Sequence, residues 1–375
     1  MAAARLDGDR YRITAPEAVG QLDSLFTSFR EQVGEAPILS GFDFPIGVPA
    51  QYARKLGITR FGDALLQFGS GEWADFFSPA EEAHQVSPSR PFYPRAPGGR
   101  KKQHLVDGVG LRSTTELLRR CDHATADRTR ACELFWTLGA NQVGRAAISG
   151  WRDLLIPALR NNIIKIWPFE GELADLLSVG GIIVAETYPA EIYSHLGFSR
   201  GFGKASREGR RKQASAMLNW CERQRIALEP DLHVRIEDGF GDTQIGEDMF
   251  DSIVGLLGMV EVIQDHWTQT VPDDPSVRHV EGWILGMNPN GKPTTPERIT
   301  GPSVHMPSRV PPIPQPSGSL SNHLFERMCP ACNKKLFARW PWGWDAHAAN
   351  NCTGISGLTT EDRKRVFKER YLRES

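Results

Sequence analysis

The chain has 375 residues, enough for two or three domains with a sizeable buried core. Hydrophobic residues make up 40% and charged residues 24%, a globular composition that excludes a fibrous or wholly disordered protein. The formal net charge of −1 gives no global sign of nucleic-acid binding. Apolar runs are shorter than the roughly 18 residues of a membrane span and no signal peptide opens the chain, so we expect a cytoplasmic protein with no membrane partner.

The N-terminal part of the chain shows strand-like and helix-like patterns in turn. Residues 2–6 and 11–14 flank an Asp-Gly-Asp turn and predict a β-hairpin. Apolar residues at helical spacing follow over 16–33, and an apolar run at 37–46 predicts a buried strand. Residues 50–150 read mainly as helices and loops.

Three further elements complete this pattern. Residues 182–185 predict a second buried strand, 248–263 a strongly apolar helix and 282–285 a last short strand. Apolar strands interleaved with helices indicate a layered fold with a covered sheet. We therefore expect residues 1–286 to form an α/β domain.

The composition changes sharply after this domain. Residues 287–322 carry nine of the 26 prolines, together with many Ser, Thr and Gly residues. Proline at this density prevents a packed core and favours an extended spacer. We therefore expect a linker over 287–322 and a small separate module over 323–375.

Three carboxylates of the first domain lie where apolar elements begin or end. Asp43 and Glu186 follow buried strands, and Asp251 lies at the start of an apolar helix. Sites in open α/β sheets form at the carboxyl ends of strands, and clustered carboxylates suit Mg²⁺ or Mn²⁺. Two such ions can stabilise the attacking and leaving oxygens of a phosphodiester. Two simpler interpretations stay open: acids near a helix start can complement its dipole, and Asp43 can be a turn residue.

Four short motifs occur in a characteristic order. They are Gly41-Phe-Asp-Phe-Pro-Ile-Gly-Val-Pro49, Glu186-Thr-Tyr-Pro-Ala-Glu191, Glu247-Asp-Met-Phe-Asp-Ser-Ile253 and Glu281-Gly-Trp-Ile284. Together they resemble the uncharacterised family of predicted nucleases catalogued as domain of unknown function 429. The resemblance covers most of residues 1–286 and implies a ribonuclease-H-like mixed sheet with helices. It also implies that Asp43, Glu186 and Asp251 are catalytic residues that hold divalent metal.

The N-terminus departs from that family pattern. A ribonuclease-H-like domain begins with a central strand that carries an Asp, whereas this sequence opens with what resembles the second and third strands. Asp7 and Asp9 belong to the hairpin turn and are poor substitutes for that Asp. The start is either misplaced or the protein is a degenerate member. We expect a misplaced start, because a sheet without its central strand exposes long unpaired edges, and the active site as written is then incomplete.

A basic segment follows the Glu186 motif. Residues 199–212 contain six positive residues and one negative residue. Lys204, Arg207 and Arg210 are candidates to bind the phosphates of a polynucleotide beside the carboxylates. The alternative is a solvated loop and helix start, as for most runs of charge.

The C-terminal module carries the most specific metal signal. Cys329 and Cys332 form a Cys-x₂-Cys pair, and His347 and Cys352 follow at a spacing of about one helical turn. Four such ligands predict a closed, structural Zn²⁺ site, and the pattern resembles Cys-Cys-His-Cys zinc fingers. The basic residues of the last predicted helix suit nucleic acid or a protein partner.

These patterns support two hypotheses for function. The first is a divalent-metal-dependent nuclease whose zinc finger recognises substrate or a partner. The alternative is a non-catalytic scaffold that binds nucleic acid or protein. The sequence leaves open the choice between DNA and RNA, endo- or exonuclease action, and the oligomeric state.

Overall fold

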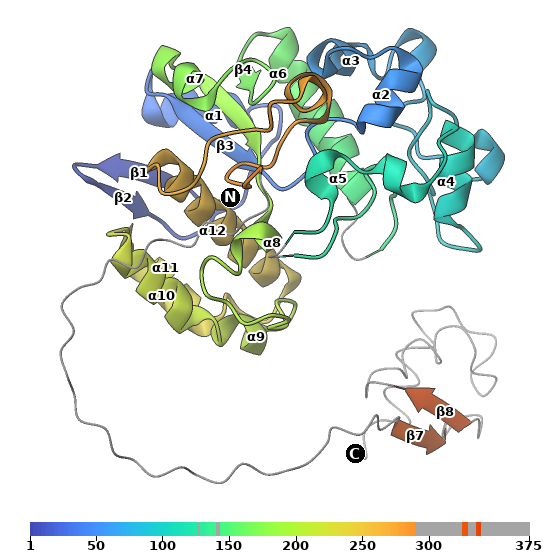
Figure 1. The fold of residues 1–375 in the computed structure, drawn as a ribbon. Helices are drawn as coiled ribbons and strands as arrows, with labels where there is room; N and C mark the ends of the chain where they lie inside the picture. Colours follow the sequence, from blue (N-terminus) through green and yellow to red (C-terminus); the bar gives the residue numbers. More distant parts are fainter. Residues whose placement is uncertain (126–127, 140–142, 290–324, 329–334, 339–375) are drawn as a thin grey trace. The chain divides into compact units, whose positions relative to one another are not determined.

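The computed structural model describes residues 1–125, 128–139, 143–289, 325–328 and 335–338 (Figure 1). The chain divides into two compact units, Met1–Ile299 and Thr300–Ser375. In the second unit, β7 (Phe325–Met328) and β8 (Lys335–Ala338) pair antiparallel, with Met328 opposite Lys335. All four predicted zinc ligands, Cys329, Cys332, His347 and Cys352, lie outside the described residues, so the zinc site stays a prediction.

The first unit combines short strands with many helices, which confirms a mixed α/β class. Its strands are β1 (Ala4–Asp7), β2 (Arg10–Ile13), β3 (Ile38–Phe42), β4 (Ile164–Ile166), β5 (Ile182–Glu186) and β6 (Ala227–Leu228). Its α-helices are α1 (Leu25–Val33), α2 (Ala50–Leu56), α3 (Phe61–Gln67), α4 (Lys102–Val109), α5 (Val143–Ser149), α6 (Ile156–Arg160), α7 (Leu173–Val179), α8 (Pro189–Ile192), α9 (Arg207–Arg211), α10 (Ala214–Arg223), α11 (Pro230–Asp238) and α12 (Gln244–Ile263). Two π-helical segments cover Gly150–Leu155 and Val277–Glu281.

The described strands of this unit form two three-stranded sheets. In the first, β1 and β2 form the predicted antiparallel hairpin and β6 joins β2 in parallel. In the second, β3, β5 and β4 are parallel with β5 in the centre. No pairing among the described strands joins the two sheets, and a single ribonuclease-H-like sheet therefore stays a proposal.

The parallel sheet is buried on both faces because β5 is apolar at every position before Glu186. Ile182 and Val184 belong to one apolar cluster, whereas Ile183 and Ala185 belong to a second cluster on the opposite face. Side chains alternate across a strand, so the continuous apolar run covers both faces. Helix α12 packs against β3 and contributes its apolar residues to the second cluster.

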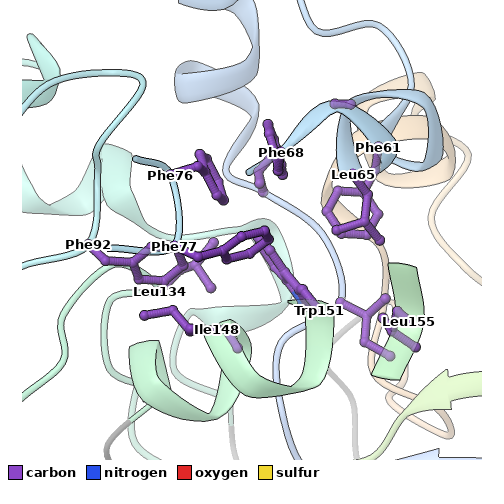
Figure 2. Close-up of a cluster of buried hydrophobic side chains, with 14 of the residues drawn as sticks. Phe61, Leu65, Phe68, Phe76, Phe77, Phe92, Leu134, Ile148, Trp151 and Leu155 are labelled. Atoms are coloured by element: carbon purple, nitrogen blue, oxygen red, sulfur yellow. The ribbon is translucent and has the colours of Figure 1, made fainter. Parts of the chain in front are cut away.

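Several aromatic side chains pack together in the first cluster (Figure 2). The rings of Phe68 and Phe76 are stacked with centroids 3.7 Å apart, and Trp151 lies 5.2 Å from Phe61. The indole nitrogen of Trp151 donates to the carbonyl of Pro45 at 2.7 Å. This hydrogen bond ties the aromatic core to the loop that follows β3, beside the candidate site.

Two predicted elements differ in the structure. The helix predicted over 16–33 is confined to Leu25–Val33, because Pro16 and Gly20 precede it and Gly20 has a φ of 76°. The strand predicted over 282–285 is reduced to one bridge between Ile284 and Glu186. The two buried strands and the long apolar helix are present, with α12 starting four residues earlier than the pattern suggested.

Candidate functional site

The ends of two parallel strands bring Asp43 and Glu186 together. Phe42 pairs with Glu186 in the register of β3 and β5, and Asp43 is the next residue. The backbone N–H of Thr187 donates to the carbonyl of Phe42 at 2.9 Å, which extends the pairing past Glu186. Both carboxylates therefore lie at the same edge of the sheet, as the strand-end argument requires.

Helix α12 brings further carboxylates to this edge. Asp251 and Glu247 lie one turn apart near its N-terminal end. The helix approaches closely because β3 has Gly41 at the contact: a Cβ there would lie 2.5 Å from the sulfur of Met259. A larger residue at position 41 would require the side chains of Met259 and Thr187 to move.

Asp251 is held on both oxygens by neighbouring side chains. The hydroxyl of Tyr193 donates to Oδ1 at 2.5 Å, and the ammonium of Lys204 donates to Oδ2 at 2.7 Å. Lys204 also lies 3.3 Å from Glu247. Desolvation lowers the pKa of Lys204, but the two carboxylates outweigh it and the net pKa is raised. Lys204 therefore stays charged and serves as a built-in cation.

Asp43 is different, because no hydrogen bond or ion pair to its carboxylate occurs within the part of the chain that the structure describes. Desolvation, Asp251 and Glu186 raise the pKa of Asp43 to about 7, and Lys204 opposes the rise. The residue is exposed to solvent although protein surrounds its carboxyl group densely. Desolvation of the carboxyl group is the largest cause of the raised pKa, and repulsion from the neighbouring carboxylates adds to it.

Glu186 is buried, 5% exposed, and its carboxylate is fully engaged. Arg119 donates to both oxygens, at 2.7 Å to Oε1 and 2.6 Å to Oε2. The backbone N–H of Ile46 donates to Oε2 at 2.7 Å. A bidentate guanidinium and a backbone donor occupy the positions that a metal ion would otherwise take.

Arg119 is completely buried, and each of its five side-chain N–H groups has an acceptor. Besides Glu186, it contacts Asp122 through Nε at 3.1 Å and Nη2 at 2.8 Å. The fifth acceptor is the carbonyl of Glu281, 3.3 Å from Nη1. Desolvation alone would lower the pKa of Arg119, but Asp122 and Glu186 hold it well above its usual value.

The three candidate phosphate-binding residues have different surroundings. Lys204 bonds the carboxylates, as above. Arg207 pairs with Asp238 and Asp242 and keeps a side-chain exposure of 41%. Arg210 is 1% exposed and donates to the carbonyls of Lys204, Gly239 and Gly241 at 2.6–2.9 Å. Arg210 therefore fixes the loop that carries Lys204, and of the three only Lys204 and Arg207 reach solvent.

Of the three carboxylates predicted to hold metal, Asp43 and Asp251 are the two that could hold a single divalent ion, because Glu186 is engaged with Arg119. Mg²⁺ keeps several waters and is commonly bound by one or two carboxylates plus substrate phosphates. Asp43 and Asp251 can supply those two carboxylates, whereas Glu186 is engaged with Arg119. Among the described residues, no group of three or more His, Cys, Asp or Glu side chains is arranged to hold a metal ion.

Two site residues were not identified from the sequence. Tyr193 lies just after the Glu186 motif, but one tyrosine near an acid is too common to stand out. Arg119 had a usable signal, since it follows Leu117 and Leu118 and precedes Cys121, and a charged residue among buried apolar residues needs a partner. The sequence does not show that this partner is Glu186, 67 residues later.

Comparison with known proteins adds no relative: no family model, curated protein or solved structure matches the chain. The proposed resemblance to the predicted-nuclease family therefore rests on the four motifs. Within the described part of the chain, every helix is too short or too polar to cross a membrane.

Proposed function

We propose that the protein is a divalent-metal-dependent phosphodiesterase that acts on nucleic acid, with Asp43 and Asp251 as the ligands of a Mg²⁺ or Mn²⁺ ion. The observation that carries the proposal is the state of Asp43. Asp43 is an exposed residue, and the pKa of its carboxyl group is raised to about 7 by desolvation and by Asp251 and Glu186. A carboxylate crowded by others is stabilised by an added cation.

The surrounding residues have separate parts in this proposal. When bound, the metal ion would activate water and stabilise the leaving oxygen. Tyr193 fixes the orientation of Asp251 through its hydrogen bond. Lys204 supplies a positive charge 2.7 Å from Asp251, at a side-chain exposure of 42%, where it can also attract a phosphate.

In this proposal the C-terminal module binds the nucleic-acid substrate or a partner. A Zn²⁺ ion on Cys329, Cys332, His347 and Cys352 would organise the short segment, which has too few residues for a large core. Strands β7 and β8 flank the Cys329–Cys332 segment, with their ends paired at Met328 and Lys335. Paired strands on either side of a Cys-x₂-Cys sequence are compatible with such a site.

The alternative is a non-catalytic scaffold that binds nucleic acid or protein. One observation favours it: Arg119 and Lys204 already neutralise Glu186 and Asp251. A site whose carboxylates are paired internally has less need of metal. Under this alternative the residues of the four motifs serve only to pack the domain and to form its ion pairs.

Metal-dependent cleavage is the direct test. Purified full-length protein is incubated with labelled single- and double-stranded DNA and RNA, with Mg²⁺, with Mn²⁺ and with EDTA. We expect cleavage that requires the divalent ion, that Asp251→Asn abolishes and that Arg207→Gln only weakens. Arg207→Gln is the matched control because it removes a positive charge of the same basic segment from a residue that pairs with Asp238 and Asp242 and not with Asp43 or Asp251.

A second result would support the alternative. Binding of nucleic acid without cleavage, unchanged by Asp251→Asn and lost in Cys329→Ser, would identify a zinc-dependent binding protein. Cleavage that persists in EDTA would contradict the metal-dependent proposal.

A further inference from the structure

The buried carboxylates at the end of β5 have a cation of their own. Glu186 and Asp122 are buried and their carboxylates contact the guanidinium of Arg119, which also donates to the backbone carbonyl of the buried Glu281. Asp122 and Glu186 each receive two hydrogen bonds from it. A shared cation between two carboxylates is the arrangement that a divalent ion would otherwise provide.

The guanidinium holds segments that are distant in sequence. Arg119 begins the 3-10 turn Arg120–Asp122, Glu186 ends β5, and Glu281 ends the π-helical segment Val277–Glu281. The same Glu186 oxygen that accepts from Arg119 also accepts from Ile46, in the loop after β3. The cation therefore lies at the junction of four chain segments.

We propose that the guanidinium of Arg119 takes the place of a divalent cation at the carboxyl end of β5. Glu186 then forms an ion pair with Arg119 and does not bind metal. It follows, if the proposed function is correct, that the protein holds one divalent ion, on the side of Asp43 and Asp251. Arg119 is then a positioning residue: it touches neither substrate nor metal, and it fixes the strand end from which the site is built.

Cation rescue of a charge-removing variant tests this inference. In Arg119→Met, Glu186 and Asp122 lose their counter-ion, and we expect millimolar Mn²⁺ to take its place. The melting temperature of Arg119→Met should rise with Mn²⁺ by at least about 3 °C more than that of the wild type. In the matched control Arg119→Met/Glu186→Gln, which also lacks the Glu186 charge, this extra rise should disappear.

The outcomes are distinct. An equal effect of Mn²⁺ on the wild type and on Arg119→Met would overturn the inference. If Arg119→Met does not fold alone, its refolding yield with and without Mn²⁺ replaces the melting temperature, and recovery by Mn²⁺ supports the inference while equal yields overturn it.

Calorimetric titration separates this inference from the proposed function. We expect one Mn²⁺ per wild-type chain, and a loss of affinity of at least about tenfold in Asp251→Asn, which lacks one of the two proposed ligands. Two ions per wild-type chain would overturn the inference and leave the proposed function standing. No binding by the wild type would overturn the proposed function, and the rescue experiment would still decide the role of Arg119.

Discussion

The two carboxylate groups at the edge of the parallel sheet are built on opposite principles. Around Arg119 the charges are buried and every donor of the guanidinium is used. Around Asp43 the charges are partly exposed, and within the described residues the Asp43 carboxylate has no partner. The buried group cannot exchange partners without breaking the packing, whereas the exposed group can accept a proton, a cation or a ligand.

The contrast shows that closeness of acids is not enough to define a metal site. Glu186 and Asp43 lie at neighbouring strand ends. The Glu186 carboxylate accepts hydrogen bonds from Arg119, whereas the Asp43 carboxylate has no hydrogen-bond partner among the described residues. What differs is the element behind each residue. Glu186 faces the segment with Arg119, and Asp43 faces the N-terminal part of α12.

The largest expected effect comes from removing the buried guanidinium of Arg119. We expect Arg119→Met to lower the free energy of unfolding by about 3–5 kcal/mol, because it leaves two buried carboxylates without a counter-ion. Urea denaturation followed by tryptophan fluorescence measures the loss. Arg119→Met/Glu186→Gln should lose less than the single variant, and an equal or greater loss in the double variant would show that the charges are not coupled.

A second test compares a buried and an exposed arginine in the basic segment 199–212. Arg210→Met should lower the free energy of unfolding by about 2–3 kcal/mol, because three backbone carbonyls lose a charged donor. Arg207→Met should lower the free energy of unfolding clearly less than Arg210→Met, because the ion pairs of Arg207 are partly exposed to solvent. Both values come from the same denaturation experiment, and similar losses would contradict the assignment of Arg210 as the buried anchor.

The exposed group predicts a dependence of stability on pH. The pKa of Asp43 is raised to about 7 in the folded protein, whereas it is about 4 in the unfolded chain. Between these two pH values the folded protein therefore binds one proton more than the unfolded chain. The stabilisation of the folded state by protonated Asp43 is fully present below about pH 4, and it is lost as the pH rises through about 7. At pH 8 we expect Asp43→Asn to be more stable than the wild type by about 1 kcal/mol, a figure reduced for solvent screening, and at pH 4 to be equal to it. Denaturation at both pH values checks the sign, and a variant less stable at pH 8 would contradict it.

The smallest effect concerns Lys204. Lys204→Met should change the free energy of unfolding by less than about 1 kcal/mol, because the lysine is half-exposed. The variant should raise the pKa of Asp43 further, since the lysine charge now lowers it. Carboxyl NMR titration of Asp43 in the wild type and in Lys204→Met measures the shift. A fall in the Asp43 pKa would show that Lys204 does not act on this group.

The strands that form the site could be predicted because their apolar runs are unambiguous. Residues 182–185 and 37–46 read as buried strands, and the structure has β5 and β3 there. The position of Asp43 and Glu186 at neighbouring strand ends followed from general rules for parallel sheets. Helix α12 was equally clear from its apolar face.

The partners of the carboxylates could not be predicted in the same way. A strand or helix is specified by a local pattern, whereas the pairing of Arg119 with Glu186 joins residues 67 positions apart. The role of Arg210 was missed for a related reason, since its acceptors are backbone carbonyls and leave no mark in the sequence. The strand at 282–285 was predicted from composition, and a single bridge at Ile284 is all that pairs with β5.

The three partners of Arg119 also set an order in which the site can assemble. Asp122 is three residues away, so this pair can form as soon as the segment leaves the ribosome. Glu186 emerges later, and the Glu281 carbonyl later still. During synthesis the arginine is first a local partner of Asp122 and becomes a cross-link between distant segments only when β5 docks. Long-range contacts such as those of Arg119 with Glu186 and Glu281 form more slowly than local ones.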